Sequence, residues 1–310
     1  MTAAEIYKAA QQTCAVFHLP NRVLVEFTGG DRARFLHNFC TNDINGLSVH
    51  AGCEAIFTNI KARAMGHGFV FAGESSHWLE TVRDGLDVLL KHLDKYIITD
   101  DVEFKILEDV RQVLVTGPAA VERLAVACHP PVDPLAPLTQ AQSGDVWLRR
   151  CDPFDQPGIQ LAGTEEQLAK FVEEINAPLG NAEVYEALRL EAGFPLYGTD
   201  VTEDHLAPEA GRVEKTISYR KGCYLGQEPI ARIDALGHVN KSLCRVAISG
   251  TSSVETGSAI TSGSGDEAGT VSSLAVDPTS ERCVGLAWLK REHMSPETEL
   301  KLGDRTVTVV

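Results

Sequence analysis

The feature that most constrains the fold is a change of pattern near residue 241. Before it, segments with helical spacing of apolar residues alternate with strand-like segments. After it, only short strand-like segments remain, joined by turns rich in Gly, Ser and Asp; they span residues 243–248, 270–276, 283–289 and 306–310. Mixed segments followed by short strands indicate an α+β fold that ends in a small barrel. We therefore predict an α+β region over residues 1–235 and a small antiparallel β-barrel over residues 236–310.

Capping signals mark three helices in the first region. Thr2 opens a capping box, residues 164–167 form a second one, and Asn181 caps a helix that extends to about Ala192. Strand-like segments cover residues 22–27, 55–58, 68–71 and 77–82. Residues 129–143 are rich in Pro, Gln and Ala, which predicts an exposed loop.

Charge and length limit the possible partners. The chain has 310 residues, with 28 Lys and Arg against 43 Asp and Glu, so the formal net charge is −15. A strongly acidic protein repels phosphate backbones, and we expect no direct contact with nucleic acid. No apolar run approaches the roughly 18 residues of a membrane helix. The N-terminus lacks the features of a secretory signal or a transit peptide. These observations predict a cytoplasmic protein that does not bind membranes.

The eight cysteines are predicted to be free thiols. None forms a Cys-x-x-Cys pair, and the histidines show neither His-x-x-His nor His-Glu-x-x-His spacing, so no metal site of side chains is expected. The even number of cysteines would also be compatible with disulfides. However, a chain of this length does not need them, and the cytosol keeps thiols reduced. Most of the cysteines should therefore be small buried apolar residues.

The densest cluster of chemically active side chains lies at residues 220–228. Arg220 and Lys221 stand next to Cys223, and cations of this kind stabilise a thiolate. Gly222 and Gly226 allow the backbone to approach a ligand closely. Cys223 is therefore the best candidate for a reactive thiol. The alternative is a glycine-rich loop with an ordinary cysteine, because neighbours in sequence need not be neighbours in space.

A second cluster lies at residues 189–193. Glu191 falls in the last turn of its predicted helix, where a carboxylate opposes the helix dipole at a cost of about 0.3–1 kcal/mol. Carboxylates bind pairs of adjacent N–H donors in a bidentate manner. A pterin presents such a pair through its ring N–H and its exocyclic amine. Glu191 is thus a candidate for binding a pterin, and the alternative is a solvated surface glutamate.

These clusters carry a family resemblance that extends over nearly the whole chain. The segment 221–228, followed by residues 231–232, resembles the signature of the YgfZ-type folate-binding proteins. The wider superfamily, which includes the glycine-cleavage T-protein, an aminomethyltransferase, shares further segments; they are residues 189–193, 197–200, 208–211, 269–273 and 285–288. The most specific part of the resemblance is residues 189–232.

The resemblance implies three subdomains in a ring around a central hole that binds tetrahydrofolate, with residues 1–235 forming two interleaved α+β subdomains. Glu191 would hold the pterin edge, and Lys221 and Cys223 would be the functional residues of the signature. Further folate-binding residues implied by the resemblance are Arg232, Gln227 and Tyr197. The family is linked to the assembly or repair of iron–sulfur clusters, including those of enzymes that modify tRNA. The implied partners are therefore folate, client proteins and cluster-assembly factors.

One segment departs from the aminomethyltransferase pattern. Those enzymes carry an aspartate in the stretch that matches residues 59–67, where this chain has no Asp or Glu. Without a carboxylate the reaction lacks its acid–base partner. His67 could replace it, but its two flanking glycines favour a simple turn residue. We therefore expect an accessory factor. The alternatives are an aminomethyltransferase and a folate-sensing scaffold with no chemistry at Cys223.

Overall fold

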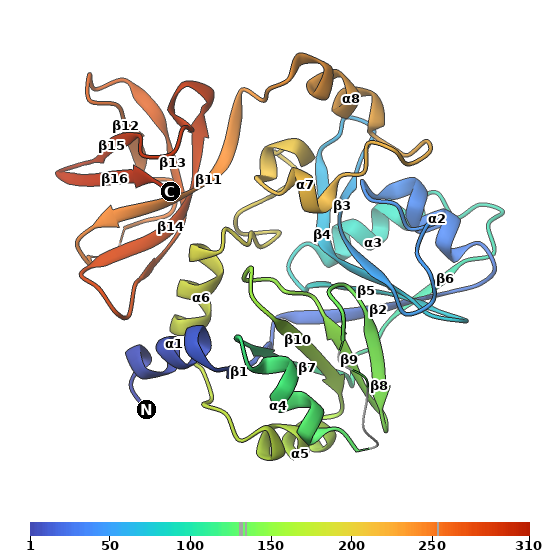
Figure 1. Ribbon diagram of the computed structural model, residues 1–310. Coiled ribbons are helices and arrows are strands. Elements are labelled where there is room, and N and C mark those ends of the chain that lie inside the picture. The colour runs from blue at the N-terminus through green and yellow to red at the C-terminus, as the bar shows by residue number, and fades with distance from the viewer. Residues whose placement is uncertain (130–132, 134, 253) are drawn as a thin grey trace.

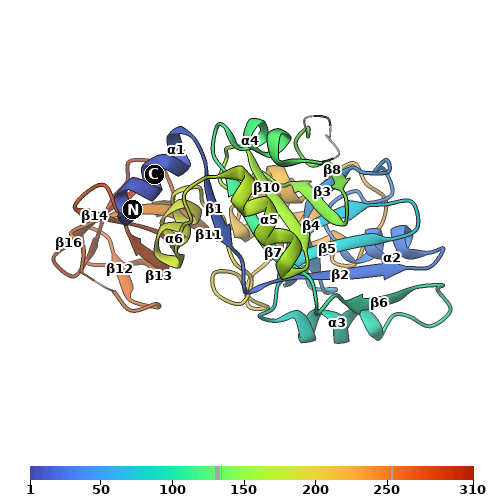
Figure 2. The ribbon, with the colours of Figure 1, turned by 90° about the horizontal axis from the view of Figure 1, so that it is seen from below.

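The structure, a computed structural model, describes residues 1–129, 133, 135–252 and 254–310. It contains two five-stranded sheets and a closed barrel (Figure 1). The barrel lies at one end of the molecule and the two sheets at the other, as the second view also shows (Figure 2). Among the described residues, none of the helices has both the length and the apolar character required to cross a membrane.

The first sheet has the strand order β3-β4-β5-β2-β6. Its strands are β2 (Arg22–Thr28), β3 (Gly52–Thr58), β4 (Ala64–Ala72), β5 (His77–Val82) and β6 (Glu103–Ile106). Two helices, α2 (Arg32–Phe39) and α3 (Leu86–Asp94), share a buried apolar core with it. Every residue of β3, β4 and β5 is buried, which means that both faces of the sheet are covered.

The second sheet has the strand order β1-β7-β10-β9-β8. Its strands are β1 (Ala15–His18), β7 (Arg111–Thr116), β8 (Gln140–Ser143), β9 (Val146–Arg150) and β10 (Gly158–Gly163). The helices α4 (Ala120–Ala127) and α5 (Glu165–Ile175) pack against it. Trp78 of the first sheet packs against Trp147 of the second, with ring centroids 4.8 Å apart, so the two sheets meet through a buried and a partly buried aromatic side chain.

The barrel closes in the order β11-β14-β13-β12-β15-β16, and all its pairs are antiparallel. Its strands are β11 (Lys241–Ser249), β12 (Ala259–Thr261), β13 (Glu267–Val276), β14 (Arg282–Lys290), β15 (Glu299–Leu302) and β16 (Arg305–Val309), with the short helix η2 (Arg291–His293) after β14. Alternating Val, Ile and Leu side chains fill its interior. The predicted α+β fold with a C-terminal antiparallel barrel is confirmed.

The remaining helices pack into an apolar core that includes residues of both sheets and of the barrel. They are α1 (Ala3–Gln12), α6 (Ala182–Glu191), η1 (Ala207–Ala210), α7 (Val213–Thr216) and α8 (Gln227–Leu236). Both predicted capping boxes are present, at Thr2 and Thr164, and the Asn181 side chain accepts a hydrogen bond from the Val184 amide at the start of α6. Local capping chemistry was therefore sufficient to locate the starts of these helices.

The predicted loop over residues 129–143 is wrong at its end. Residues 140–143 form strand β8, which pairs with β9 across a tight turn. The Gln140 side chain is buried and donates to the Ala72 carbonyl, so tertiary contacts outweigh the polar composition of this strand. Residues 130–132 and 134 of the predicted loop lie outside the described residues.

The thiol prediction agrees with the structure at every cysteine. All eight cysteines are free, and six of them are buried. Cys244 is partly exposed and Cys223 is the exposed one. No group of three or more His, Cys, Asp or Glu side chains that could hold a metal ion occurs within the described ranges.

Candidate functional site

A cavity of about 760 Å³ lies between the barrel and helices α7 and α8. The barrel contributes Leu243 and Leu286 to its wall, and α8 contributes Ile233 and Asp234. In Figure 1 the barrel lies at the left, α7 near the centre and α8 at the upper right. The volume of the cavity falls in the range of about 300–1,000 Å³ that is usual for small-molecule sites. The cavity is therefore the candidate ligand-binding site.

Charged side chains of both signs line this cavity. Lys215 of α7 forms an ion pair with Asp155, which lies in the turn before β10. Arg245 of β11 is exposed and donates to the main-chain carbonyl of Glu191. Asp234 and Glu214 add carboxylates to the wall. The cavity can thus contact both an anionic group and a group with several N–H donors.

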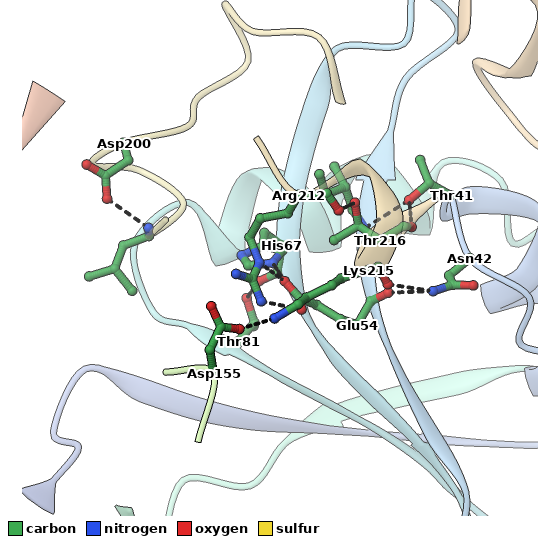
Figure 3. A network of polar contacts seen from close by, with 12 residues as sticks. Thr41, Asn42, Glu54, His67, Thr81, Asp155, Asp200, Arg212, Lys215 and Thr216 are labelled. Carbon is green, nitrogen blue, oxygen red and sulfur yellow. Dashed lines mark hydrogen bonds and ion pairs between the residues drawn. The ribbon is translucent and has the colours of Figure 1, made fainter. Parts of the chain in front are cut away.

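Arg212, also on the wall, belongs to a buried network that continues into the first sheet (Figure 3). Its guanidinium binds the Glu54 carboxylate in a bidentate manner, with N–O distances of 2.5 and 2.7 Å. The His67 Nε2 atom lies 2.7 Å from the same carboxylate. Glu54 pairs with Phe69 and Ile56 pairs with His67 in the β3–β4 ladder, which makes Glu54 and His67 diagonal neighbours on one face of the sheet.

The network keeps Glu54 ionised. Burial alone would raise the pKa of Glu54, but hydrogen bonds from His67 and Arg212 outweigh it and lower the pKa to about 2. The Arg212 guanidinium also lies over the Phe194 ring, 5.0 Å from its centroid. A carboxylate with these partners ties the wall of the cavity to the first sheet and has no proton to donate near neutral pH.

The prediction that His67 is a turn residue is wrong. It lies inside β4 and is 3% exposed. A Cβ at the preceding Gly66 would meet the Leu89 side chain of α3 at 2.7 Å, so this glycine allows α3 to approach the sheet. Sequence analysis also missed Glu54, because the carboxylate that reaches His67 comes from the neighbouring strand.

The signature loop places its two functional candidates differently. Lys221 is half-buried, and its ammonium donates to three main-chain carbonyls, those of His37, Cys40 and Asn42, at 2.6–2.7 Å. Burial lowers the pKa of Lys221. Cys223, two residues further along, is exposed. Both residues therefore lie in one loop, but the ammonium of Lys221 points toward the end of α2.

The four predicted folate-binding residues are dispersed. The Glu191 Oε2 atom accepts hydrogen bonds from the Tyr7 hydroxyl and from Gln11 of α1. Tyr197 is buried and its hydroxyl donates to the Ala64 carbonyl. Gln227 accepts from the Tyr224 amide, and Arg232 is exposed on α8. None of these four, nor Lys221 or Cys223, is among the described residues that line the cavity, although Ala192 and Ile233 beside them are.

Comparisons with known proteins agree with this architecture. No protein-family model matches the chain. The chain is 28% identical over 256 residues to the tRNA-modifying protein YgfZ of Yersinia enterocolitica, which covers 78% of the chain and 73% of that protein. It is 25% identical over 250 residues to the same protein of Colwellia psychrerythraea, covering 76% of the chain and 74% of the relative. A putative chloroplastic transferase of Arabidopsis thaliana is 25% identical over 295 residues, covering 90% of the chain and 66% of that protein.

Among solved structures, the aminomethyltransferase T of the glycine cleavage system from Bartonella henselae superposes with a TM-score of 0.86. The match covers 99% of this chain and 88% of that one at 18% sequence identity, which shows a common fold. The chain is therefore similar in sequence to the YgfZ proteins and has the fold of the aminomethyltransferase.

Proposed function

We propose that this protein binds tetrahydrofolate, or a derivative of it, and acts as an accessory factor in the assembly or repair of iron–sulfur clusters, including those of enzymes that modify tRNA. The observation that carries the proposal is the cavity of about 760 Å³ between barrel and helices, with both cations and carboxylates on its wall. The relatives named as tRNA-modifying proteins support the link to tRNA modification. The same proposal assigns folate binding mainly to residues 1–235, and the barrel contributes the opposite wall with Arg245.

The residues on this wall fit the chemistry of a folate. Its pterin end has adjacent N–H donors, and carboxylates such as Asp234 and Glu214 can accept hydrogen bonds from them. Its glutamate end is anionic and suits Lys215 and Arg245. Apolar side chains of the barrel and of α8 can cover the flat ring system between these ends. Tetrahydrofolate would supply or accept a one-carbon unit when bound, and the residues of this chain would orient it.

Glu191 remains our candidate for the pterin edge. Its two neighbours in sequence, Ala192 and Gly193, line the cavity. Both hydrogen bonds that Glu191 accepts within the described chain fall on Oε2, and a carboxylate can accept at both oxygens. Arg232, Gln227 and Tyr197 lie on or beside the elements that border the cavity, and we propose them as secondary contacts.

The first test is folate binding by calorimetry. We expect a Kd in the micromolar range, which corresponds to a binding free energy of about −8 kcal/mol. The Glu191→Gln variant should weaken binding about tenfold or more, because it removes a charge-assisted hydrogen bond to a pterin donor. Glu183→Gln, an exposed change in the first turn of the same helix, is the matched control. Equal affinity of Glu191→Gln and wild type would remove Glu191 from the site.

The second test separates this protein from an aminomethyltransferase. Because Glu54 is held ionised by Arg212 and His67, it cannot act as a proton donor near neutral pH. We expect no methylenetetrahydrofolate when the purified protein is incubated with tetrahydrofolate and aminomethylated carrier protein. Turnover in this assay would establish the aminomethyltransferase alternative.

The third test concerns Cys223, the proposed reactive thiol of the signature. Under native conditions it should be the first cysteine to react with iodoacetamide, because it is the exposed one and six of the others are buried. Peptide mapping after brief treatment measures this order. A Cys223→Ser gene should also fail to restore cluster-dependent tRNA modification in cells that lack the protein. Full complementation would favour the scaffold alternative instead.

A further inference from the structure

The Lys221 ammonium has no hydrogen atom left for the thiol. An ammonium group has three N–H donors and no acceptor. In this structure three main-chain carbonyl oxygens, of His37, Cys40 and Asn42, lie within 2.6–2.7 Å of Nζ. They belong to the last turn of α2 and the residues just after it, where carbonyls lack helical partners. A cation at this end of a helix is also favourable to its dipole.

Lys221 is the principal attachment of the loop that carries Cys223. The Ser218 amide donates to the Thr41 carbonyl at one end of the loop, and the Leu225 amide donates to the Asn38 carbonyl at the other. Between these ends, the described chain shows hydrogen bonds from residues 219–224 to the rest of the protein at two points. Lys221 donates to the three carbonyls at the end of α2, and Tyr224 exchanges two hydrogen bonds with Gln227 at the start of α8. The side chain of Lys221 also lies over the Tyr224 ring, with Nζ 4.6 Å from its centroid.

We propose that Lys221 is a positioning residue for Cys223: its ammonium fastens residues 219–224 to the end of α2 and thereby holds the thiol in one place at the surface. It does not act on the sulfur atom directly. This inference rests on the proposed function only in taking Cys223 as the functional group of the signature.

The same attachment connects the thiol to the cavity. Tyr219, at the start of the loop, lines the cavity wall, whereas Cys223 lies on the exposed part of the loop. A loop held at Lys221 therefore has one end at the cavity wall and its thiol at the protein surface. Loss of the Lys221 hydrogen bonds would therefore loosen both Tyr219 at the cavity wall and Cys223 at the surface.

Hydrogen exchange of the full-length protein measures the attachment. In Lys221→Met, which keeps the length of the side chain and removes its N–H donors, the Tyr224 and Leu225 amides, which donate to Gln227 and to the Asn38 carbonyl, should exchange about tenfold faster or more. Each charge-assisted hydrogen bond is worth at least that factor. Exchange in the barrel strands should not change. Lys8→Met, at an exposed lysine of α1, is the control. Unchanged exchange in the loop would overturn the proposal.

The pH profile of Cys223 alkylation distinguishes positioning from activation by charge. If Lys221 only positions the loop, Lys221→Met changes the rate of Cys223 alkylation at the high-pH plateau. The pH at which alkylation reaches half of this rate stays the same. Lys221→Arg provides a second variant that keeps the charge. A planar guanidinium cannot direct three donors from one point to three carbonyls, so this variant should also lose loop protection. A shift of the midpoint in Lys221→Met that Lys221→Arg restores, with the loop still protected, would show activation instead.

These results stand apart from the proposed function. Exchange and alkylation are measured without folate, clusters or partner proteins, so they test the attachment even if the protein does not bind folate. Conversely, a Cys223→Ser gene that complements fully would refute the role of the thiol. The exchange data would still show whether Lys221 holds the loop.

Discussion

Glu54→Ala should lower the free energy of unfolding by about 3–5 kcal/mol, the range for removing one partner of a buried ion pair. Glu54 is 3% exposed, and Arg212, its bidentate partner, is 7% exposed. The variant leaves the Arg212 guanidinium buried without its carboxylate and removes the acceptor of His67. Denaturant unfolding measures the loss. Glu103→Ala, at an exposed glutamate of β6 in the same sheet, should change stability by less than about 0.5 kcal/mol.

A double variant tests whether the cost comes from the unpaired charge. Glu54→Ala combined with Arg212→Leu removes both charges, so it should be clearly less destabilised than the sum of the two single variants. Additive effects would mean that the pair contributes little, and that packing around Phe194 carries the stability of this region.

The pH dependence of stability gives an independent measure of the same pair. The pKa of Glu54 is about 2 in the folded protein, below the ordinary value of 4.5, so its contribution is complete above about pH 4.5. It is lost as the pH falls from about 4.5 toward 2. A difference of about 2.5 pKa units corresponds to about 3 kcal/mol. The gap in stability between wild type and Glu54→Gln should therefore narrow over this interval, and a constant gap would contradict the assignment.

Short-range signals in the sequence were reliable and long-range contacts were not visible in it. The capping boxes at Thr2 and Thr164 act within four residues, and the barrel strands are short segments joined by turns rich in Gly, Ser and Asp, so local pattern was enough to predict them. Arg212 and Glu54 are 158 residues apart, and Lys221 is 179–184 residues from its three carbonyls. Spacing along the chain carries no information on such pairs. For this reason the sequence identified the signature loop but not what holds it.

The motif at residues 189–200 illustrates this difference between a recognised pattern and its physical role. The sequence singled out Glu191 within it as a ligand-binding carboxylate. In the structure the two ends of the motif, Arg189 and Asp200, form a buried ion pair at 2.7 Å, with both residues 1% exposed. Asp200 also accepts hydrogen bonds from Ser272 and Ser273 of β13. The motif therefore joins α6 to the barrel.

Asp200→Ala should accordingly weaken the attachment of the barrel. The change leaves Arg189 buried without its principal partner and removes the acceptor of both serine hydroxyls. Glu186 still pairs with Arg189 at 2.7 Å, so we expect a loss near the lower end of the range for a broken buried pair, about 3 kcal/mol. Hydrogen exchange should show the increase at β13 and at the end of α6. Asp204→Ala, an exposed aspartate in the same connection, is the control.

A loosened barrel in Asp200→Ala should also alter the cavity, because the cavity wall is made by the barrel on one side and by α7 and α8 on the other. If Asp200 holds the barrel in place, the Asp200→Ala protein should lose affinity for folate even though Asp200 does not line the cavity. The Trp288 indole, which donates to the Asp200 carbonyl and stacks on His205, should report the change by fluorescence. Unaltered exchange at β13 together with wild-type stability would show that the barrel is held by its apolar contacts with α6.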